Sequence, residues 1–315
     1  MDKYVLNYYP AFKCIAGECK HTCCAGWEMT IDKESLEKYK ADKSKFSLAL
    51  KQGVDFKKSK FKTDKKGKCA FLNQNALCDI IINLGEENLC QVCRDHPRFN
   101  NFFEDRTETG LGFCCEQATK MILSFSGKIE PVLIEKKQND CLPSFIEQLV
   151  IDFRKKVLDV IQDRRLDINQ RITAILFDNN AQITQCEFKK MLKTFSRFER
   201  LDKSWQTRLK NLKRKTFNFN TGSNLSLYCE QFLTNSFFRH LSNVKDTMLL
   251  RERTLACVIS WLVIKSIYEN EVTLNNEFET ICDVVRAFSA EVEYSQKNLD
   301  ELFSSVNKII KTTNN

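Results

Sequence analysis

Cysteine is the residue type with which this chain could most readily do chemistry. The 315 residues include 15 cysteines, and ten of these stand within the first 115 positions. Four form a C-x4-C-x3-C-C pattern, Cys14, Cys19, Cys23 and Cys24. If the segment from Cys19 to Cys24 is helical, Cys19 and Cys23 share one face and Cys24 points about 100° away, so the adjacent pair would have two different roles.

Six further cysteines follow in the same region: Cys69, Cys78, Cys90, Cys93, Cys114 and Cys115. The C-x2-C pair among them is modest evidence alone, but together with the first group it supplies enough sulfur for a closed four-thiolate site. Soft thiolates select zinc or an iron–sulfur cluster over magnesium or calcium, and three histidines leave little scope for histidine-rich coordination. The spacing does not choose between zinc and iron–sulfur.

Two known cluster motifs are absent. The C-x3-C-x2-C motif of radical S-adenosylmethionine enzymes would place its third cysteine at Gly26, and the plant-type ferredoxin spacing fails by one residue after Cys19. We therefore expect thiolates from distant segments to converge on one centre, which requires folded elements to position them.

The N-terminal sequence predicts a cytoplasmic protein, because it lacks the basic flank and the ~7 to 15 apolar residues of a secretory signal. The most apolar stretch, 255–267, contains Ser260 and Lys265 and is shorter than the ~20 residues that cross a bilayer, so we expect no membrane partner. In a reducing cytoplasm, clustered thiols more often bind metal or do redox chemistry than form disulfides.

Positive charge is concentrated in one stretch. Between Lys33 and Lys68 there are 13 lysines and five acidic residues, an excess of +8 that equals the formal net charge of the whole chain. A polyanion could bind such a stretch, but we favour a solvated lysine-rich surface. The basic segment 197–215 contains Trp205 without a nucleic-acid-binding motif, so we interpret it as an amphipathic helix and expect no nucleic-acid partner.

The second half of the chain has a helical pattern. The 172 residues after Pro143 contain no proline and one glycine, which removes most of the signals for tight turns. Apolar residues recur there at helical spacing. One stripe is Phe145, Leu149, Phe153, Val157 and Ile161, and another is Phe278, Ile281, Val285, Phe288 and Val292; similar patterns occupy 183–198, 225–241, 255–267 and 299–310.

We therefore predict a mainly α fold, with a cysteine-rich metal-binding N-terminal region packed on a C-terminal all-helical domain. The predicted boundaries are 1–125 for the cysteine-rich region, 126–143 for a connector and 144–315 for the helical domain. Five cysteines without ligand-like spacing are predicted to be core residues: Cys141, Cys186, Cys229, Cys257 and Cys282.

The cysteine-rich region resembles the flagellin lysine-N-methylases, which belong to a broader group of CxxxCC proteins described as zinc- or iron-chelating. The resemblance covers roughly residues 4–117. Its positions are Tyr8, Phe12, Cys14, Gly17, Cys19, Cys23, Cys24, Trp27, Ile31, Asp32, Cys69, Leu77, Cys78, Cys93, Pro97, Arg98, Cys114 and Glu116.

The resemblance implies an enzyme that methylates lysine ε-amines of flagellin, with S-adenosylmethionine as co-substrate and a 4Fe-4S cluster, or alternatively zinc, held by thiolates. The implied metal ligands are Cys14, Cys19, Cys23, Cys24, Cys69, Cys78, Cys93 and Cys114, whereas Cys90 and Cys115 lie outside the family pattern. Four ligands suffice for one cluster, so the others would serve a second site or the fold.

The sequence names no catalytic base and no cofactor loop. Asp79, His96 and Glu116 could accept a proton, but surface or capping roles are the simpler interpretation. No glycine-rich loop of the Rossmann type follows a recognisable strand, so we expect the cofactor pocket in a cleft between the cysteine-rich and helical regions.

Two other functions remain open at this stage. A non-catalytic zinc- or iron-chelating module, whose helical domain docks a partner, is the main alternative. A metal-stabilised nucleic-acid binder is a third, and it requires salt-sensitive binding.

Overall fold

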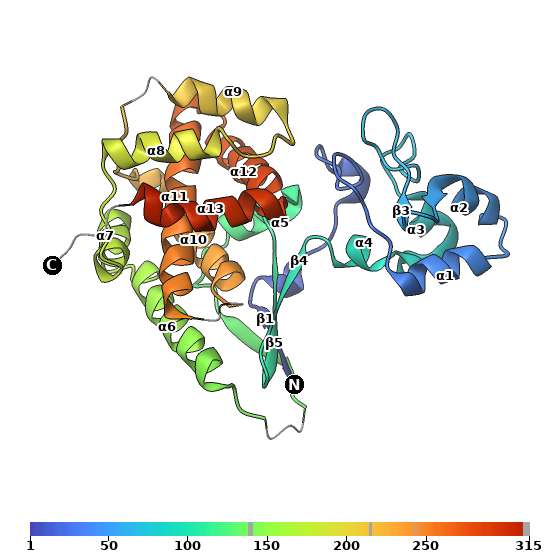
Figure 1. Cartoon of the computed structure of the whole chain (residues 1–315), viewed down its shortest axis with the longest axis horizontal. Helices are drawn as coiled ribbons and strands as arrows, with labels where there is room; N and C mark the ends of the chain where they lie inside the picture. The colour runs from blue at the N-terminus through green and yellow to red at the C-terminus, as the bar shows by residue number, and fades with distance from the viewer. Residues whose placement is uncertain (138–140, 214–215, 243, 245, 311–315) are drawn as a thin grey trace. The chain divides into compact units, whose positions relative to one another are not determined.

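The computed structural model describes residues 1–137, 141–213, 216–242, 244 and 246–310. The chain forms two compact units (Figure 1): unit 1 comprises Met1–Phe12 and Phe99–Asn315, and unit 2 comprises Lys13–Arg98. Unit 2 is thus an insertion, because the chain leaves unit 1 after Phe12 and returns to it at Phe99.

These boundaries differ from those predicted. The predicted cysteine-rich region 1–125 is divided between the two units, and residues 99–125 belong with the helices. The predicted connector 126–143 contains a strand of unit 1, and its residues 138–140 lie outside the described ranges. The physical reason is strand pairing, which ties these segments to the N-terminus.

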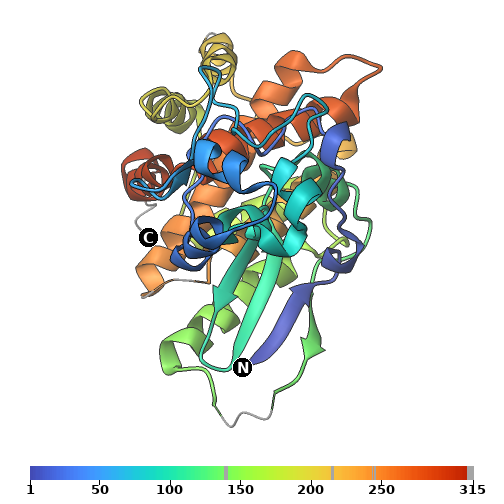
Figure 2. The same cartoon turned by 90° about the vertical axis from the view of Figure 1, so that its right-hand side faces the viewer.

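Unit 1 contains a four-stranded sheet in the order β4-β5-β1-β6. Its strands are β1 (Asp2–Leu6), β4 (Arg98–Phe102), β5 (Arg106–Leu111) and β6 (Pro131–Glu135). Strand β1 pairs in parallel with β5 and antiparallel with β6. Figure 2 shows this order by colour, with the blue β1 between the teal β4 and β5 and the green β6. A parallel pair needs a crossover connection, and here that connection carries unit 2.

Nine α-helices of unit 1 lie within the described residues, and they confirm the mainly α prediction. They are α5 (Glu116–Leu123), α6 (Phe145–Ile161), α7 (Ile168–Asp178), α8 (Gln185–Phe195), α9 (Lys203–Leu212), α10 (Ser226–His240), α11 (Thr247–Glu271), α12 (Glu277–Phe288) and α13 (Gln296–Ile309). Each of the predicted helical patterns falls on one of them. The amphipathic segment around Trp205 is α9, as expected.

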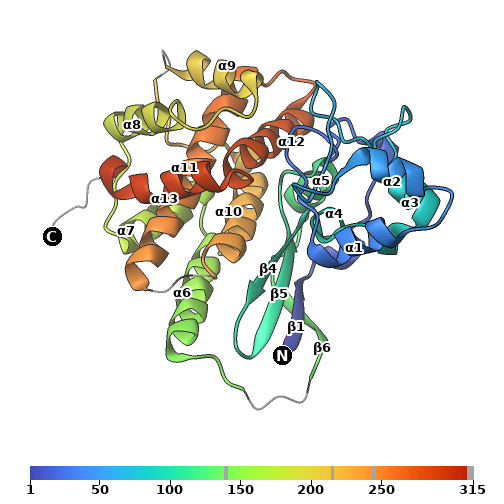
Figure 3. The same cartoon turned by 45° about the vertical axis from the view of Figure 1, so that its right-hand side comes forward.

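The core of unit 1 surrounds α10 and α11. Helix α11 contacts α10, α12 and α13 (Figure 3), and Phe232 of α10 lies against Phe113 and Trp261. One predicted stripe is only partly buried, because Phe145 at the start of α6 is 77% exposed whereas Val157 and Ile161 are buried.

Three of the five cysteines predicted to be core residues are buried: Cys229, Cys257 and Cys282. The prediction is wrong for Cys141 and Cys186, which are exposed. Cys141 precedes α6, and Cys186 stands in the first turn of α8, where it faces solvent. Within the described ranges, no helix is both long enough and apolar enough to span a membrane.

Unit 2 has short elements around a core of its own. They are α1 (Lys33–Ala41), α2 (Ser47–Gly53), β2 (Val54–Asp55), β3 (Lys60–Phe61), α3 (Asp79–Leu84) and α4 (Gln91–Asp95). The buried residues include Leu50, Phe61 and Phe71 together with Cys69 and Cys90. The lysines of the segment 33–68 are exposed except for Lys60, which is half-buried, so this stretch forms the solvated surface that we expected.

Candidate functional site

Backbone hydrogen bonds bring the cysteine-bearing segments of unit 2 together. The amide of Cys69 donates to the carbonyl of Cys24 at 2.8 Å, and Cys78 forms a bridge with Leu72, three residues beyond Cys69. The Trp27 indole donates to the carbonyl of Cys23 at 2.7 Å and stacks on His96. These backbone contacts therefore hold the segment of Cys23 and Cys24 next to the segment of Cys69 and Cys78.

Helix α4 positions the C-x2-C pair. Cys90 directly precedes this helix, and the amide of Cys93 donates to the Cys90 carbonyl at 3.0 Å. The Asp32 carboxylate, which caps α1, also accepts from the amide of Gln91 at 2.7 Å and so ties the two helices together. Cys90 is fully buried.

Two thiol pairs of unit 2 are hydrogen-bonded, Cys23 with Cys24 and Cys90 with Cys93. A hydrogen bond from Cys23 lowers the pKa of Cys24 to about 7, against the opposing effect of burial. A hydrogen bond from Cys93 likewise lowers the pKa of Cys90, and the same bond together with burial raises the pKa of Cys93. Cys24 and Cys90 are therefore the thiols most ready to act as thiolates.

The remaining two thiols are shielded from water. Burial raises the pKa of Cys69 to about 12, and the charges of Cys24, Cys78 and Cys90 add to that effect. Burial also raises the pKa of Cys78. Hydrogen bonds or electrostatic effects on pKa thus link six thiols of unit 2: Cys23, Cys24, Cys69, Cys78, Cys90 and Cys93. We call these residues the thiol cluster.

The other three predicted ligands are Cys14, Cys19 and Cys114. Cys114 precedes α5 in unit 1, where burial raises the pKa of its thiol to about 12 despite a hydrogen bond with Tyr294. Cys14 is exposed and its sulfur accepts from the Ala16 amide, while the Cys19 thiol donates to the His21 carbonyl. The conditional helix from Cys19 to Cys24 is not formed, because the regular structure nearby is a single 3-10 turn at Ala16–Glu18.

Cys90 was left outside the predicted ligand set but belongs to the thiol cluster. The signal was available in the sequence, because two cysteines separated by two residues place both thiols at one helix start. All described cysteines are free of disulfides. In the part of the chain that the structure describes, no three histidine, cysteine or acidic side chains stand in a ready-made arrangement for a metal ion.

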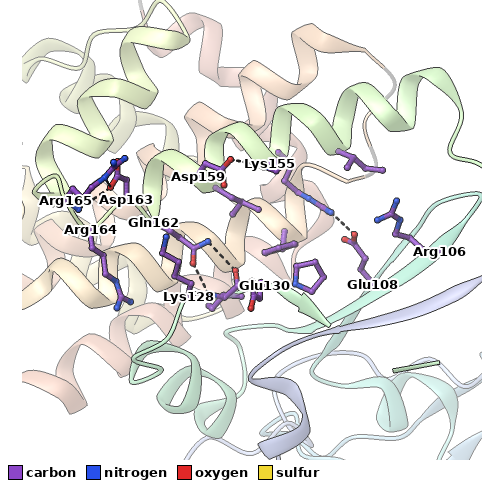
Figure 4. Close-up of a pocket in the computed structure, with 16 residues that line it drawn as sticks. Arg106, Glu108, Lys128, Glu130, Lys155, Asp159, Gln162, Asp163, Arg164 and Arg165 are labelled. Atoms are coloured by element: carbon purple, nitrogen blue, oxygen red, sulfur yellow. Dashed lines mark hydrogen bonds and ion pairs between the residues drawn. The ribbon is translucent and has the colours of Figure 1, made fainter. Parts of the chain in front are cut away.

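Unit 1 contains a cavity of about 940 Å³, bounded by β5, the segment leading into β6, and α6 (Figure 4). Its floor carries a buried ion pair: Arg154 donates to Glu108 Oε1 at 2.7 Å, and the two residues are 4% and 2% exposed. Arg154 also donates to Ser242 at 2.7 Å, and its guanidinium group lies over the rings of Phe103 and Phe238. No local sequence pattern marks this pair, because its members stand on a strand and a helix that are 46 positions apart in the chain.

The rim of this cavity is polar and internally paired. Lys155 pairs with Asp159 and Arg165 with Asp163, each at 2.7 Å. Gln162 holds the wall in place, because its side chain exchanges two hydrogen bonds with the backbone of Ile129. The predicted position of a pocket, a cleft between two regions, is not tested by this cavity, which belongs to unit 1 alone.

The chain is similar to three curated proteins of Salmonella. It is 27% identical over 121 residues to proteins named lysine-N-methylase from Salmonella typhimurium and Salmonella choleraesuis, and equally to the flagellar biosynthetic protein FliU of Salmonella muenchen. The similar part is 36% of this chain; it covers 30% of each lysine-N-methylase and 72% of FliU. No family model and no solved structure matches the chain.

Proposed function

We propose that this protein is a protein-lysine N-methyltransferase that acts on flagellin with S-adenosylmethionine as methyl donor. The observation that carries the proposal is the similarity to two lysine-N-methylases, and the name of FliU supports a flagellar substrate. The chain spans about 30% of the length of the two lysine-N-methylases that it matches. We therefore assign their methyltransferase activity to this chain as a proposal.

We further propose that the thiol cluster holds a metal centre, either a 4Fe-4S cluster or zinc. The donor chemistry fits both, because each is bound by four thiolates and the thiol cluster offers six. The described side chains form no ready-made metal site, so binding would require these thiols to move closer together. Cys24 and Cys90 would be ligands, with two more from the other four residues. A bound centre would cross-link the short elements of unit 2 and, if it is an iron–sulfur cluster, add a redox-active group.

The proposed reaction is a polar displacement that needs no electrons from a metal. The amine nitrogen attacks the methyl carbon, the carbon–sulfur bond breaks with its electron pair going to sulfur, and the nitrogen loses a proton. Free lysine has a pKa of ~10.4, so the protein must present the amine in its neutral form. Desolvation and the positive charge of the sulfonium both favour that form.

The reaction is tested by incubating flagellin with the anaerobically purified protein and S-adenosylmethionine and then measuring the intact mass of flagellin. Mass steps of one methyl group support the proposal. An unchanged mass with metal-loaded protein contradicts it. That result would favour a non-catalytic chelating module with a docking domain.

The metal centre has a separate test. We expect Cys90→Ser and Cys93→Ser to lose metal and the soluble fold of unit 2, because both thiols belong to the thiol cluster, whereas Cys257→Ser should retain metal. The exposed Cys186→Ser is the matched control. Metal content per protein is measured after anaerobic purification, with a brown colour for iron–sulfur and none for zinc. Equal metal content in all four variants would contradict the assignment.

A further inference from the structure

We propose that the cavity of unit 1 binds an alkylammonium group through Glu108. The inference rests on the proposed function, which supplies two sources of such a group: the side chain of the lysine to be methylated and the α-ammonium group of the methyl donor. We favour the lysine side chain, and the experiment below distinguishes the two.

The first argument is an unused hydrogen-bond acceptor. Glu108 Oε1 accepts from Arg154, but Glu108 Oε2 is buried and has no hydrogen-bond partner among the described residues. Buried carboxylate oxygens are almost always hydrogen-bonded, because an unsatisfied one loses its hydration without replacement. A donor brought by a ligand would restore the missing bond.

The second argument is that Arg154 cannot supply this bond by turning. Its guanidinium group is held by Ser242 through one nitrogen and lies 4.8 Å from the ring centroid of Phe238 and 5.6 Å from that of Phe103. Figure 4 shows Glu108 reaching from β5 to the ion pair on the α6 side of the cavity. The carboxylate is therefore fixed before any ligand arrives, which lowers the entropy lost on binding.

The third argument is the sign of the ligand. Four cations of the lining already pair with carboxylates: Arg106 with Asp105, Lys155 with Asp159, Arg164 with Glu230 and Arg165 with Asp163. Outside the Arg154–Glu108 pair, Lys128 and Glu130 are the remaining charged residues of the lining, and their charges offset each other. An anion at the floor would face the carboxylate of Glu108. A cation gains a charge-assisted hydrogen bond there.

The walls also suit a lysine side chain. Ile151, Leu158 and Phe238 line the cavity with apolar surface that can contact a methylene chain. A lysine side chain has an apolar methylene stem and a charged end, so it suits a site that combines apolar walls with a carboxylate.

The test uses the full chain and measures steady-state methylation of flagellin. We expect Glu108→Gln to raise the KM for flagellin roughly tenfold or more, with a smaller change in kcat, because it replaces a charge-assisted hydrogen bond with a neutral one. Glu135→Gln, an ion-paired carboxylate on β6 outside the cavity, is the control. An increase in the KM for S-adenosylmethionine instead would assign the site to the donor's ammonium group. Unchanged KM values for both would overturn the proposal.

A binding measurement separates this inference from the proposed function. Wild-type protein should bind Nα-acetyl-lysine amide and not Nα-acetyl-norleucine amide, which has no ammonium group, in calorimetric titration. Ile151→Trp, which narrows the cavity and keeps both members of the ion pair, should weaken this binding while thermal unfolding stays cooperative. If flagellin is not methylated but Nα-acetyl-lysine amide binds in a Glu108-dependent manner, the proposed function fails and the ammonium site stands. No difference between the two amides overturns the site.

Discussion

Glu293 is a buried carboxylate whose charge depends on its neighbours. It follows α12 and pairs with Arg239 at 3.1 Å and with His240 at 2.8 Å, and the thiol of Cys257 lies near it on α11. Burial alone would raise the pKa of Glu293, but the charge of Arg239 and the hydrogen bond from His240 outweigh it and lower the pKa to about 2. The native state therefore keeps this carboxylate ionised.

This shift predicts a loss of stability in acid. Because the pKa of Glu293 falls from the usual 4.5 to about 2 on folding, its contribution is present above pH 4.5 and is lost as the pH falls towards 2. Burial lowers the pKa of His240, so protonation of this group in the unfolded chain acts in the same direction below its usual 6.5. Full protonation of Glu293 in acid should lower the free energy of unfolding by about 3 kcal/mol.

Urea unfolding at pH 7, 4.5 and 3 checks this expectation. The variant Glu293→Gln should cost about 3 to 5 kcal/mol at pH 7, since Arg239 keeps a buried charge without its partner. It should also show a weaker dependence on pH than the wild type. Parallel pH curves for the two proteins would contradict the assignment.

For individual residues, the sequence predicts chemistry that depends on neighbouring positions, but it does not predict which side chains pair across the fold. The C-x2-C pair and the C-x3-C-C run identified most of the thiol cluster, because neighbouring residues carry the signal. Glu108 and Arg154 meet across 46 positions, and Glu293 and His240 across 53, so nothing local marks either pair.

Helix α6 illustrates what an element's ends contribute. Its N-cap, Ser144, accepts from the Glu147 amide, and the Glu147 side chain accepts from the Ser144 amide, which together form a capping box. The sequence predicts this helix well because an apolar stripe at helical spacing begins directly after Pro143. The sequence does not predict that the first turn of α6 is exposed. An apolar stripe shows which face of a helix packs, but it does not show how far along the helix the neighbouring elements extend.

The capping box should be measurable. We expect Ser144→Ala to lower the free energy of unfolding by about 1 kcal/mol, because the Glu147 amide in the first turn of α6 loses its side-chain acceptor. Ser304→Ala is the matched control, since Ser304 is exposed inside α13 and alanine favours helices. Urea denaturation followed by circular dichroism gives both values. A larger loss for the control would argue against the role of the cap.

The sheet is the element type that the sequence did not predict. Strand β5 contains Arg106, Thr107 and Thr109, and β1 begins with Asp2 and Lys3, so neither shows a long apolar run. Their pairing depends on tertiary contacts, such as the Tyr8 hydroxyl group donating to Asn235 and accepting from the Leu111 amide. Such contacts join residues more than a hundred positions apart.

The whole molecule consists of two units with separate cores. The buried core residues of unit 1 all come from residues 1–12 and 99–310, and those of unit 2 from 13–98. Composition predicted two regions of different character, but it could not predict that one is inserted into the other.

Separate cores predict that unit 1 folds without unit 2. A variant in which a short glycine–serine linker replaces residues 13–98 should keep the helical circular dichroism signal and a cooperative thermal transition, since no core residue of unit 1 is removed. Chelator treatment of the full chain should affect only the transition of unit 2. A non-cooperative melt of the shortened variant would show that the two units depend on each other for folding.

The insertion also decides how the molecule comes apart under proteolysis. The polypeptide enters unit 2 after Phe12 and leaves it before Phe99, so two connections join the units. A protease that cleaves one connection leaves the two units covalently joined through the other. Liberating the thiol-bearing portion as a free fragment therefore takes two cleavages, and a singly nicked protein keeps its thiols tethered to the helices.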